Sequence, residues 1–256
     1  MTLIILIALL GVQSDPGPVI AGGGGKLPDS ISARALELAG GTQAHVVVVP
    51  LASRRPDAGI STVARFLALK ATSSELLNTN SNADAIRQLK RATLIWMVGG
   101  SQTNLMEGLR ERKLISLIRK RHKAGMVLAG SSAGAAVMSR IMIKGGAPLD
   151  SILNGATPTS EGLDVIGDWI VDQHFMKRRR FGRLASCVID HKARGIGIDE
   201  GTAVIFHASG KLEVIGRSSA VVIDARNAST RKTRPGEPIG ASGMVLHILT
   251  EGMTLK

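Results

Sequence analysis

The 256-residue sequence lacks tyrosine altogether and holds only four phenylalanines and two tryptophans, so aromatic residues make up 2% of it. A β-sandwich with an aromatic-rich core is therefore disfavoured, and aliphatic residues must fill the interior. A protein that binds single-stranded nucleic acid stacks bases on aromatic faces, and this chain has few to offer. The net charge of +12 favours anionic partners, but we predict no nucleic-acid partner.

Cysteine is scarcer still than the aromatic residues. Cys187 is the only one, so it can form no internal disulfide and cannot by itself build a cysteine-based metal site. We expect no metal and no cofactor. With 44% hydrophobic residues, a chain of this length can bury one large core. We predict a single domain over residues 15–256.

The uncharged apolar run at residues 3–12 is too short to cross a bilayer, so we predict no stable membrane anchor. Its length suits the hydrophobic part of a signal peptide, and Val12 and Ser14 are small residues placed for a cut before Asp15. No Lys or Arg precedes the run, and an N-terminal strand is the alternative. We predict that residues 1–14 are a signal peptide and that the protein is secreted or periplasmic; without export it would be cytoplasmic.

From Pro18 onward, short apolar runs alternate with helical patterns, which is typical of a parallel sheet with crossover helices. The predicted strands are 19–22, 46–51, 94–98 and 126–129, and the predicted helices lie near 27–38, 63–69, 84–91 and 104–123. After Gly195, four apolar segments separated by turn signals predict further strands, some of them antiparallel. We therefore predict an α/β fold, a three-layer sandwich with a mainly parallel central sheet. The loop 145–163, rich in Gly, Pro, Ser and Thr, is a candidate cover for a site.

Residues 22–26 read GGGGK, which suggests a phosphate-binding loop. That motif needs a glycine where this chain has Ile20 and a Ser or Thr where it has Leu27. The dinucleotide-binding pattern fails as well, because no glycine stands at its third position. We interpret these glycines as a tight strand-to-helix turn that lets a backbone or a ligand approach closely.

Residues 130–134 read GSSAG and match the G-x-S-x-G nucleophile elbow, with a predicted strand before them and a helix-compatible run, 135–141, after them. The pattern selects Ser132 as the nucleophile. The next backbone N–H, from Ala133, would sit at a helix N-terminus and could stabilise an oxyanion. The alternative is that these small residues only permit close packing of a helix on a sheet.

A serine nucleophile needs a base, and the base needs an orienting group. Of the six histidines, His174 stands out because it lies in a polar cluster, DQHFMKRRRFGRL, that packing alone does not explain. Arg180 and Arg183 would share a helical face with Lys177 and create a positive field suited to a substrate carboxylate. A solvated basic helix start is the alternative interpretation.

The orienting group is expected among the carboxylates. Asp199 and Glu200 follow an apolar strand in the segment GIGIDEGTAVIF. Successive strand residues face opposite ways, so only one of the two carboxylates can point into a site.

Several of these motifs together resemble those of a known family. The segments GSSAGA, DQHF-x-x-R-x-R-x-GRL and GIGIDE-x-TA, in this order, are similar to those of the cyanophycinase family of serine peptidases, peptidase family S51, which are related to the aspartyl dipeptidases called peptidase E. The segment WMVGGSQTNL also resembles the family's strand followed by Gly-Gly-x-Gln, although Ser101 stands where the family commonly has Asp. The resemblance covers residues 19–203.

The resemblance implies a fold similar to that of class I glutamine amidotransferases, of flavodoxin-like type. It implies a triad in which Ser132 is the nucleophile, His174 the base and Glu200 the orienting carboxylate. It also implies an oxyanion hole formed by the N–H groups of Gly100 and Ala133, no metal, and a possible homodimer. The positions that match the family's substrate pocket are Gln102, Asp172, Gln173, Arg178, Arg180 and Arg183.

The same resemblance implies an activity. Members of the family cleave next to aspartyl residues, and cyanophycinases release β-aspartyl-arginine dipeptides from a polymer of aspartate that carries arginine side chains. We therefore expect a serine exopeptidase acting on aspartyl peptides or a cyanophycin-like polymer. Two alternatives stay open: a peptidase E-like α-aspartyl or isoaspartyl dipeptidase, and a non-catalytic α/β protein that binds an anionic ligand in the same pocket.

Overall fold

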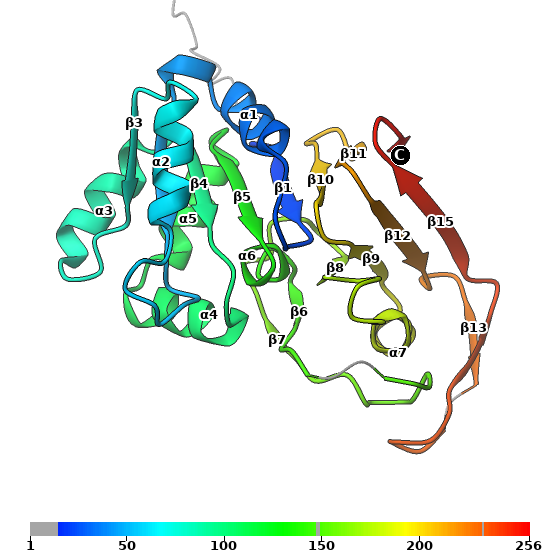
Figure 1. Ribbon diagram of the computed structural model, residues 1–256. Helices are drawn as coiled ribbons and strands as arrows, with labels where there is room; N and C mark the ends of the chain where they lie inside the picture. The colour runs from blue at the N-terminus through cyan, green and yellow to red at the C-terminus, as the bar shows by residue number, and fades with distance from the viewer. Residues whose placement is uncertain (1–14, 147–148, 232) are drawn as a thin grey trace, which may run out of the picture.

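The computed structural model describes residues 15–146, 149–231 and 233–256, and the signal peptide predicted for residues 1–14 lies outside this part of the chain. Two β-sheets lie next to each other, the larger one formed by the first half of the chain and three later strands (Figure 1). In the described ranges, no helix is long and apolar enough to cross a membrane.

The larger sheet has eight strands, of which five neighbouring ones run parallel. In spatial order these are β1 (Val19–Gly22), β5 (Val127–Ser131), β4 (Leu94–Met97), β2 (His45–Val49) and β3 (Ser73–Leu76). Three antiparallel strands extend the sheet beyond β1: β10 (Thr202–Phe206), β11 (Leu212–Gly216) and β16 (Thr254–Leu255). The inner parallel strands are buried on both faces, as their unbroken apolar sequences predict.

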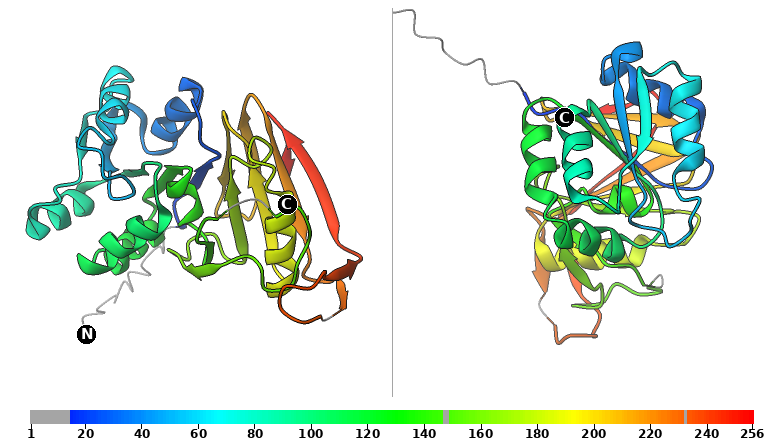
Figure 2. Two further views of the ribbon diagram at one scale, coloured as in Figure 1. Left: turned by 60° about the horizontal axis from the view of Figure 1, so that its bottom comes forward. Right: turned by 90° about the vertical axis from the view of Figure 1, so that its left-hand side faces the viewer.

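Helices cover both faces of this sheet (Figure 2). On one face lie α1 (Asp29–Leu38) and α2 (Ile60–Ala68), which bury Ile31 and Phe66 against the sheet. On the other face lie α3 (Asn82–Arg91), α4 (Gln102–Glu111) and α5 (Ile115–Lys123), which bury Leu89, Leu105 and Ile118. A short 3₁₀ helix spans Gly41–Gln43. The predicted α/β fold, with helices on both faces of a mainly parallel sheet, is confirmed.

Some predicted elements differ from the observed ones. The helix predicted over 104–123 is two helices, α4 and α5, because Lys113 adopts a left-handed conformation with φ of 56° that a continuous helix does not allow. The helical run expected at 135–141 shrinks to α6 (Ala133–Ala136), since the carbonyls of Val137 and Met138 accept hydrogen bonds from residues 163 and 165 instead of from a next helical turn. Strand β3 was not predicted, because its sequence SSEL is polar.

The second sheet has four strands in the order β15 (Val245–Thr250), β12 (Ser219–Asp224), β9 (Arg194–Ile198) and β8 (Trp169–Gln173). Only β8 and β9 run parallel, and α7 (Phe181–His191) joins them and packs on the sheet. Two short hairpins complete the fold: β6 (Ile141–Ile143) with β7 (Thr159–Glu161), and β13 (Ser229–Arg231) with β14 (Gly240–Ser242). The four strands predicted after Gly195 are present and divide between the two sheets.

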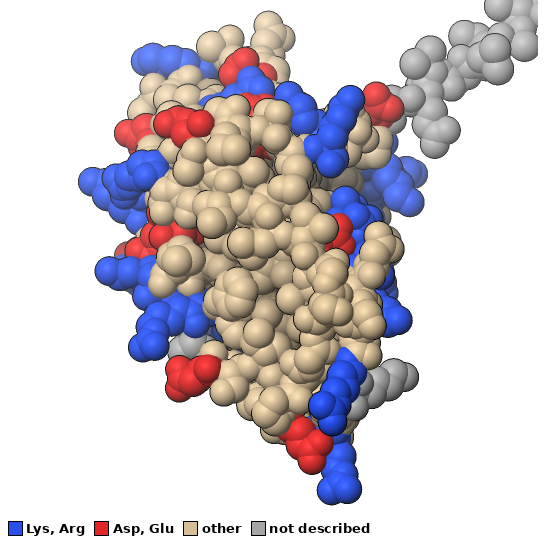
Figure 3. All heavy atoms as spheres, turned by 90° about the vertical axis from the view of Figure 1, so that its right-hand side faces the viewer, with Lys and Arg blue, Asp and Glu red and all other residues tan. Residues whose placement is uncertain are grey.

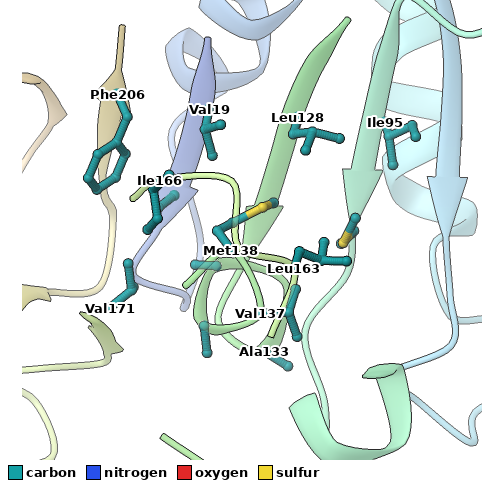
Figure 4. Close-up of a cluster of buried hydrophobic side chains, with 14 of the residues drawn as sticks. Val19, Ile95, Leu128, Ala133, Val137, Met138, Leu163, Ile166, Val171 and Phe206 are labelled. Atoms are coloured by element: carbon teal, nitrogen blue, oxygen red, sulfur yellow. The ribbon is translucent and has the colours of Figure 1, made fainter. Parts of the chain in front are cut away.

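One hydrophobic cluster connects the two sheets. Helix α6 and the residues after it lie against the larger sheet, where Val137 and Met138 meet strand residues such as Leu128 (Figure 4). The same cluster contains Val171 and Ile196 from the second sheet. The chain itself crosses from the second sheet to the first between β9 and β10, at residues 199–201. It crosses again between β11 and β12, at residues 217–218, and between β15 and β16, at residues 251–253. The two sheets therefore share one core and several tight connections.

The outer edge of the second sheet has an apolar surface. On β15, the side chains of Val245, Leu246 and Ile248 are 50%, 53% and 61% exposed. The side of the molecule on which β15 lies shows a broad area with few charged groups, and Lys and Arg gather around its rim (Figure 3). The homodimer expected from the family resemblance stays a prediction.

Candidate active site

Ser132 occupies a sharp turn between β5 and α6. Its backbone angles, φ 53° and ψ −112°, lie in a region that residues other than glycine rarely adopt. The flanking glycines make the turn possible: a Cβ on Gly130 would lie 2.5 Å from the backbone of Gly134, and a Cβ on Gly134 would collide with the carbonyl of Met97. A strand, a strained serine and a helix with close glycine packing are the local structure of a nucleophile elbow. The close packing expected of these glycines is present in the same turn, and the role of Ser132 as a nucleophile stays a prediction.

His174 follows directly after β8 and faces this serine. Its Nε2 lies 2.8 Å from Ser132 Oγ, and the residue is buried, with φ of 51°. The main chain of His174 is anchored by its N–H, which donates to the carbonyl of Gly23 at 2.7 Å. The polar cluster around His174 thus begins at the carboxyl end of a strand, where α/β proteins place their sites.

Glu200 lies in the turn between β9 and β10 and completes a chain of hydrogen bonds. Its Oε1 is 2.6 Å from His174 Nδ1. An ionised carboxylate can only accept, so Nδ1 carries the proton that is donated, and Nε2 is left to accept from the hydroxyl of Ser132. Asp199 points elsewhere: its carboxylate accepts from the Lys177 N–H at 3.0 Å and from Ser218 Oγ at 3.1 Å. Of the two carboxylates, Glu200 is the one that reaches the histidine.

The surroundings of His174 favour its neutral form. Burial lowers the pKa of the imidazole below its ordinary value, and the nearby positive charges of Arg178 and Arg180 lower it further. The hydrogen bond to Glu200 acts in the opposite direction but does not outweigh these effects. The imidazole is therefore available as a proton acceptor at neutral pH and somewhat below it.

Two backbone segments meet beside Ser132. Ala133 is the first residue of α6, so its N–H has no partner within the helix. The turn after β4 approaches from the other side, and a Cβ on Gly99 would lie 3.3 Å from the Cβ of Ser132. In the same turn Gly100 has a φ of 145°, and a side chain there would collide with the carbonyl of Ala52. The two glycines thus allow a main-chain segment to lie close to the serine.

Asp172 and Arg183 differ from what the sequence suggested. Arg183 is 1% exposed, and its guanidinium binds the carboxylate of Asp172 through Nε at 2.6 Å and through Nη2. Its Nη1 donates to the carbonyl of Gly146 at 2.8 Å. In this structure the positive charge of Arg183 is paired with the carboxylate that β8 supplies, and a contact of Arg183 with a substrate carboxylate stays a prediction. The sequence contains Asp172 close to Arg183, but no sequence pattern indicates that the two side chains form an ion pair.

Arg180 is also buried, yet only partly satisfied. Its Nη1 donates to the carbonyl and to the side-chain oxygen of Gln173, at 2.5 and 2.6 Å, while its Nε has no hydrogen-bond partner. Burial, followed by the charge of Arg183, lowers the pKa of Arg180 to about 10. Arg180 also lines a cavity of about 600 Å³ together with Phe175, Met176 and residues 149–152. Arg180 is thus a buried cation beside a cavity, and its unpartnered Nε is itself buried.

The remaining predicted pocket residues divide between surface and interior. Arg178 is exposed and close enough to His174 to lower its pKa. Gln102 is buried at the start of α4, where its amide donates to the carbonyl of Ile143 at 2.9 Å. Ser101 caps the same helix by accepting from the Asn104 N–H at 3.2 Å. Asp is an equally good N-cap, so Ser101 preserves the helix start that the family's usual Asp would provide.

Within residues 15–146, 149–231 and 233–256, no three His, Cys, Asp or Glu side chains gather in a way that could hold a metal ion. Cys187 lies buried on α7, where burial, followed by the charges of Asp190 and Asp172, raises the pKa of its thiol to about 12.

Known proteins share both sequence and fold with this chain. A family model described as peptidase family S51 matches residues 19–214. The cyanophycinase of Geminocystis herdmanii is 36% identical over 225 residues, which are 84% of this chain and 83% of that protein. The cyanophycinase of Trichormus variabilis is also 36% identical over 225 residues, which are 84% and 76% of the two chains.

Two solved structures have a similar fold. A peptidase from an acI-B1 actinobacterium matches with a TM-score of 0.68 at 21% identity, over 95% of this chain and 98% of that one. A putative peptidase E protein from Listeria monocytogenes matches with a TM-score of 0.59 at 16% identity, over 79% and 100%. The fold is thus one that peptidases use, and the sequence relatives make this chain a peptidase. It belongs to peptidase family S51.

Proposed function

We propose that this protein is a serine exopeptidase that hydrolyses aspartyl peptide bonds through an acyl-enzyme on Ser132. The observation that carries the proposal is the continuous chain of hydrogen bonds from Ser132 Oγ to His174 at 2.8 Å and from His174 to Glu200 at 2.6 Å. Such a chain activates a serine that is otherwise a weak nucleophile. The strained backbone of Ser132 supports the same role, because strain of this kind persists where it presents a reactive group.

The mechanism follows from the tautomer of His174. Its Nε2 takes the proton of Ser132 as Oγ attacks the peptide carbonyl, and it then gives this proton to the leaving amine nitrogen as the C–N bond breaks. Water enters in place of the amine, loses a proton to the same Nε2, and hydrolyses the acyl-enzyme, after which the proton returns to Oγ. Glu200 holds Nδ1–H throughout and stabilises the imidazolium that forms. General-base help of this kind contributes about 10²–10⁴ in rate.

The oxyanion of the tetrahedral intermediate would be held by the N–H groups of Ala133 and Gly100. Ala133 supports this role because it stands at a helix N-terminus with its N–H unused by the helix. Gly100 supports it because its turn lies beside Ser132 and carries no side chain that would block an approach. One such donor contributes about 10²–10³ in rate.

Substrate recognition would rest on Arg178 and Arg180. Arg178 is exposed near His174, and Arg180 lines the cavity beside Phe175. A guanidinium binds a carboxylate in two-point fashion, which suits a substrate with an aspartyl group. Gln173 orients Arg180, and Asp172 with Arg183 supports β8 and α7 beneath it. Because the relatives at 36% identity are cyanophycinases, we propose a β-aspartyl-arginine polymer as substrate.

The decisive experiment compares Ser132→Ala with Ser131→Ala. We expect Ser132→Ala to abolish peptide hydrolysis and labelling by a fluorophosphonate, with unchanged thermal unfolding. Ser131 is the adjacent serine in the same turn, so Ser131→Ala should keep both labelling and turnover to a large extent. Full activity of Ser132→Ala would rule out the mechanism.

The substrate is tested separately with purified wild-type protein. Cyanophycin, α-aspartyl dipeptides and isoaspartyl dipeptides are incubated with the enzyme, and the product masses are read. Release of β-aspartyl-arginine from the polymer supports the proposal. Cleavage of the dipeptides alone would favour a peptidase E-like activity, and absence of both cleavage and fluorophosphonate labelling would favour a non-catalytic binding protein.

A further inference from the structure

The four glycines at residues 22–25 connect β1 to the segment that leads into α1, and their carbonyls bind the main chain of all three triad segments. The carbonyl of Gly22 accepts from the Ser132 N–H at 2.9 Å. The carbonyl of Gly23 accepts from the His174 N–H at 2.7 Å. The carbonyl of Gly24 accepts from the N–H of Gly201, the residue after Glu200, at 3.1 Å. Three successive carbonyls thus hold three distant segments of the chain.

The missing side chains of this loop matter as much as its carbonyls. A Cβ on Gly24 would lie 2.5 Å from Nε2 of His174, and a Cβ on Gly25 would lie 2.8 Å from Oε2 of Glu200. Both distances are too short for real atoms, so a side chain at either position must displace a triad member. The loop is therefore shaped around the imidazole and the carboxylate.

The hydrogen bonds of the GGGGK segment also differ from those of a phosphate-binding loop. A phosphate cradle turns several N–H groups toward the anion. Here the carbonyls of Gly22, Gly23 and Gly24 point at protein N–H groups, and the N–H of Gly23 itself donates to the carbonyl of Thr202 at 2.9 Å. These three carbonyls and this N–H are directed at the protein.

We propose that residues 22–25, which we name the glycine loop, form a positioning element that sets the geometry of the Ser132–His174–Glu200 array. The inference rests on the proposed function, because it assigns the loop to that catalytic array. Its physical basis is the place of the loop: it leaves β1 in the larger sheet, whereas His174 follows a strand of the second sheet and Glu200 lies in the crossing between them. One short segment thereby binds, through its carbonyls, residues that come from both sheets.

The test is Gly24→Ala, with kcat and KM measured on the peptide substrate. The added methyl must push the imidazole away from Ser132 Oγ, and a displacement of about 1 Å at a reacting group costs on the order of 10²-fold in rate. We expect kcat to fall by about that factor, with KM little changed because the methyl touches His174 and not the pocket arginines.

A matched control separates this effect from backbone strain. Gly24 has a φ of 98°, so alanine is strained there whatever it touches. Gly40 has a φ of 103° and nothing within 4 Å of where its Cβ would stand. Gly40→Ala therefore carries a comparable backbone penalty without the contact, and we expect it to lower the melting temperature while keeping kcat.

A second pair keeps the inference testable should Gly24→Ala fail to fold. Gly25, with φ of 66°, would meet Glu200, whereas Gly41, with φ of 62°, again has nothing within 4 Å. Gly25→Ala should lower kcat relative to Gly41→Ala. If neither Gly24→Ala nor Gly25→Ala lowers kcat relative to its control, the loop does not position the triad.

A readout independent of turnover is the proton that His174 Nδ1 shares with Glu200, which should give a far-downfield proton NMR resonance because the hydrogen bond is short and charge-assisted. We expect this resonance to shift or vanish in Gly24→Ala and Gly25→Ala and to persist in Gly40→Ala and Gly41→Ala. Equal kcat and equal resonances in variants and controls would overturn the inference. Activity retained by Ser132→Ala would instead reject the proposed function, while the resonance would still report whether the loop holds His174 on Glu200.

Discussion

Backbone strain lies at both ends of the hydrogen bond through which the serine proton would pass. Ser132 and His174 have φ values of 53° and 51°, in a region that costs about 1–3 kcal/mol for residues other than glycine. Each is held by a main-chain hydrogen bond to the glycine loop. These hydrogen bonds stabilise the strained backbone conformation of both residues.

The charge of Arg178 should be visible in the pH dependence of activity. Arg178 is one of the positive charges that lower the pKa of His174. In Arg178→Gln that influence is removed, so the pKa of His174 rises and the acidic limb of the kcat/KM profile moves to higher pH. The shift should shrink at high salt, because Arg178 is exposed and its field is screened.

The neighbouring exposed residue provides the control for this experiment. Arg179→Gln makes the same change of charge one position further along, at a residue that is not among the charges acting on His174. Its profile should keep the wild-type acidic limb. An unmoved limb in Arg178→Gln, or an equal movement in both variants, would contradict the assignment.

At the level of single residues, sequence reasoning reached the serine, the histidine and the carboxylate by different routes. The elbow pattern alone selected Ser132, because flanking glycines and a strand before them are local features. Because neighbouring strand residues face opposite ways, only one of Asp199 and Glu200 was expected to point into the site, and the family resemblance implied that it is Glu200. The pairing of Asp172 with Arg183 was missed, since residues 11 positions apart on a strand and a helix leave no periodic signal.

Helix α7 and strand β8 are joined by a buried ion pair, and this pair is an element-scale feature. Both Asp172 and Arg183 are 1% exposed, and the carboxylate also accepts from the Gln173 N–H at 2.8 Å. Asp172 also lies 3.5 Å from Nη1 of Arg180, a longer ionic contact. Removing one member of a buried pair costs about 3–5 kcal/mol. The pair thus fixes how the helix after the His174 segment lies on the sheet.

We expect Arg183→Met to lower the free energy of unfolding by about 3–5 kcal/mol, measured by urea denaturation. The double variant Asp172→Asn/Arg183→Met should lose less than the sum of the two single variants, because the Asp172 carboxylate and the Arg183 guanidinium are removed together. A variant that keeps full stability but shows a raised KM would instead return Arg183 to the role of a substrate contact.

At the scale of elements, the parallel strands and their helices were predictable because their apolar runs are long and buried on both faces. The break between α4 and α5 was not, since it depends on the left-handed conformation of Lys113, a residue with no special preference for it. Helix α6 ends early because the carbonyls of Val137 and Met138 bind residues 163 and 165. Such long-range hydrogen bonds override a local helical pattern.

For the whole molecule, buried histidines should make stability fall in mild acid. His122 is 5% exposed, and burial lowers its pKa below the ordinary value of 6.5. At pH values between the lowered pKa of native His122 and 6.5, the imidazole is protonated in the unfolded chain but not in the native protein. The free energy of unfolding therefore decreases as the pH falls through this window, and His174 contributes in the same direction.

The prediction is checked with His122→Gln, unfolded by urea at about pH 7.5 and about pH 5.5. We expect the difference in unfolding free energy between the two pH values to be smaller in His122→Gln than in the wild-type protein, whatever the absolute stability of the variant. His191→Gln, at an exposed histidine on α7, should keep the wild-type difference. An unchanged difference in His122→Gln would show that His122 does not take part.

The crossing at residues 199–201, where the chain passes from the second sheet to the larger one, affects how activity would be lost under mild heat or denaturant. Ser132 belongs to one sheet and His174 to the other, and the crossing carries Glu200 between them. A small slip of one sheet past the other would leave every strand and helix intact and still separate Ser132 from His174. We therefore expect activity to be lost at a lower temperature or denaturant concentration than the spectroscopic signal of secondary structure.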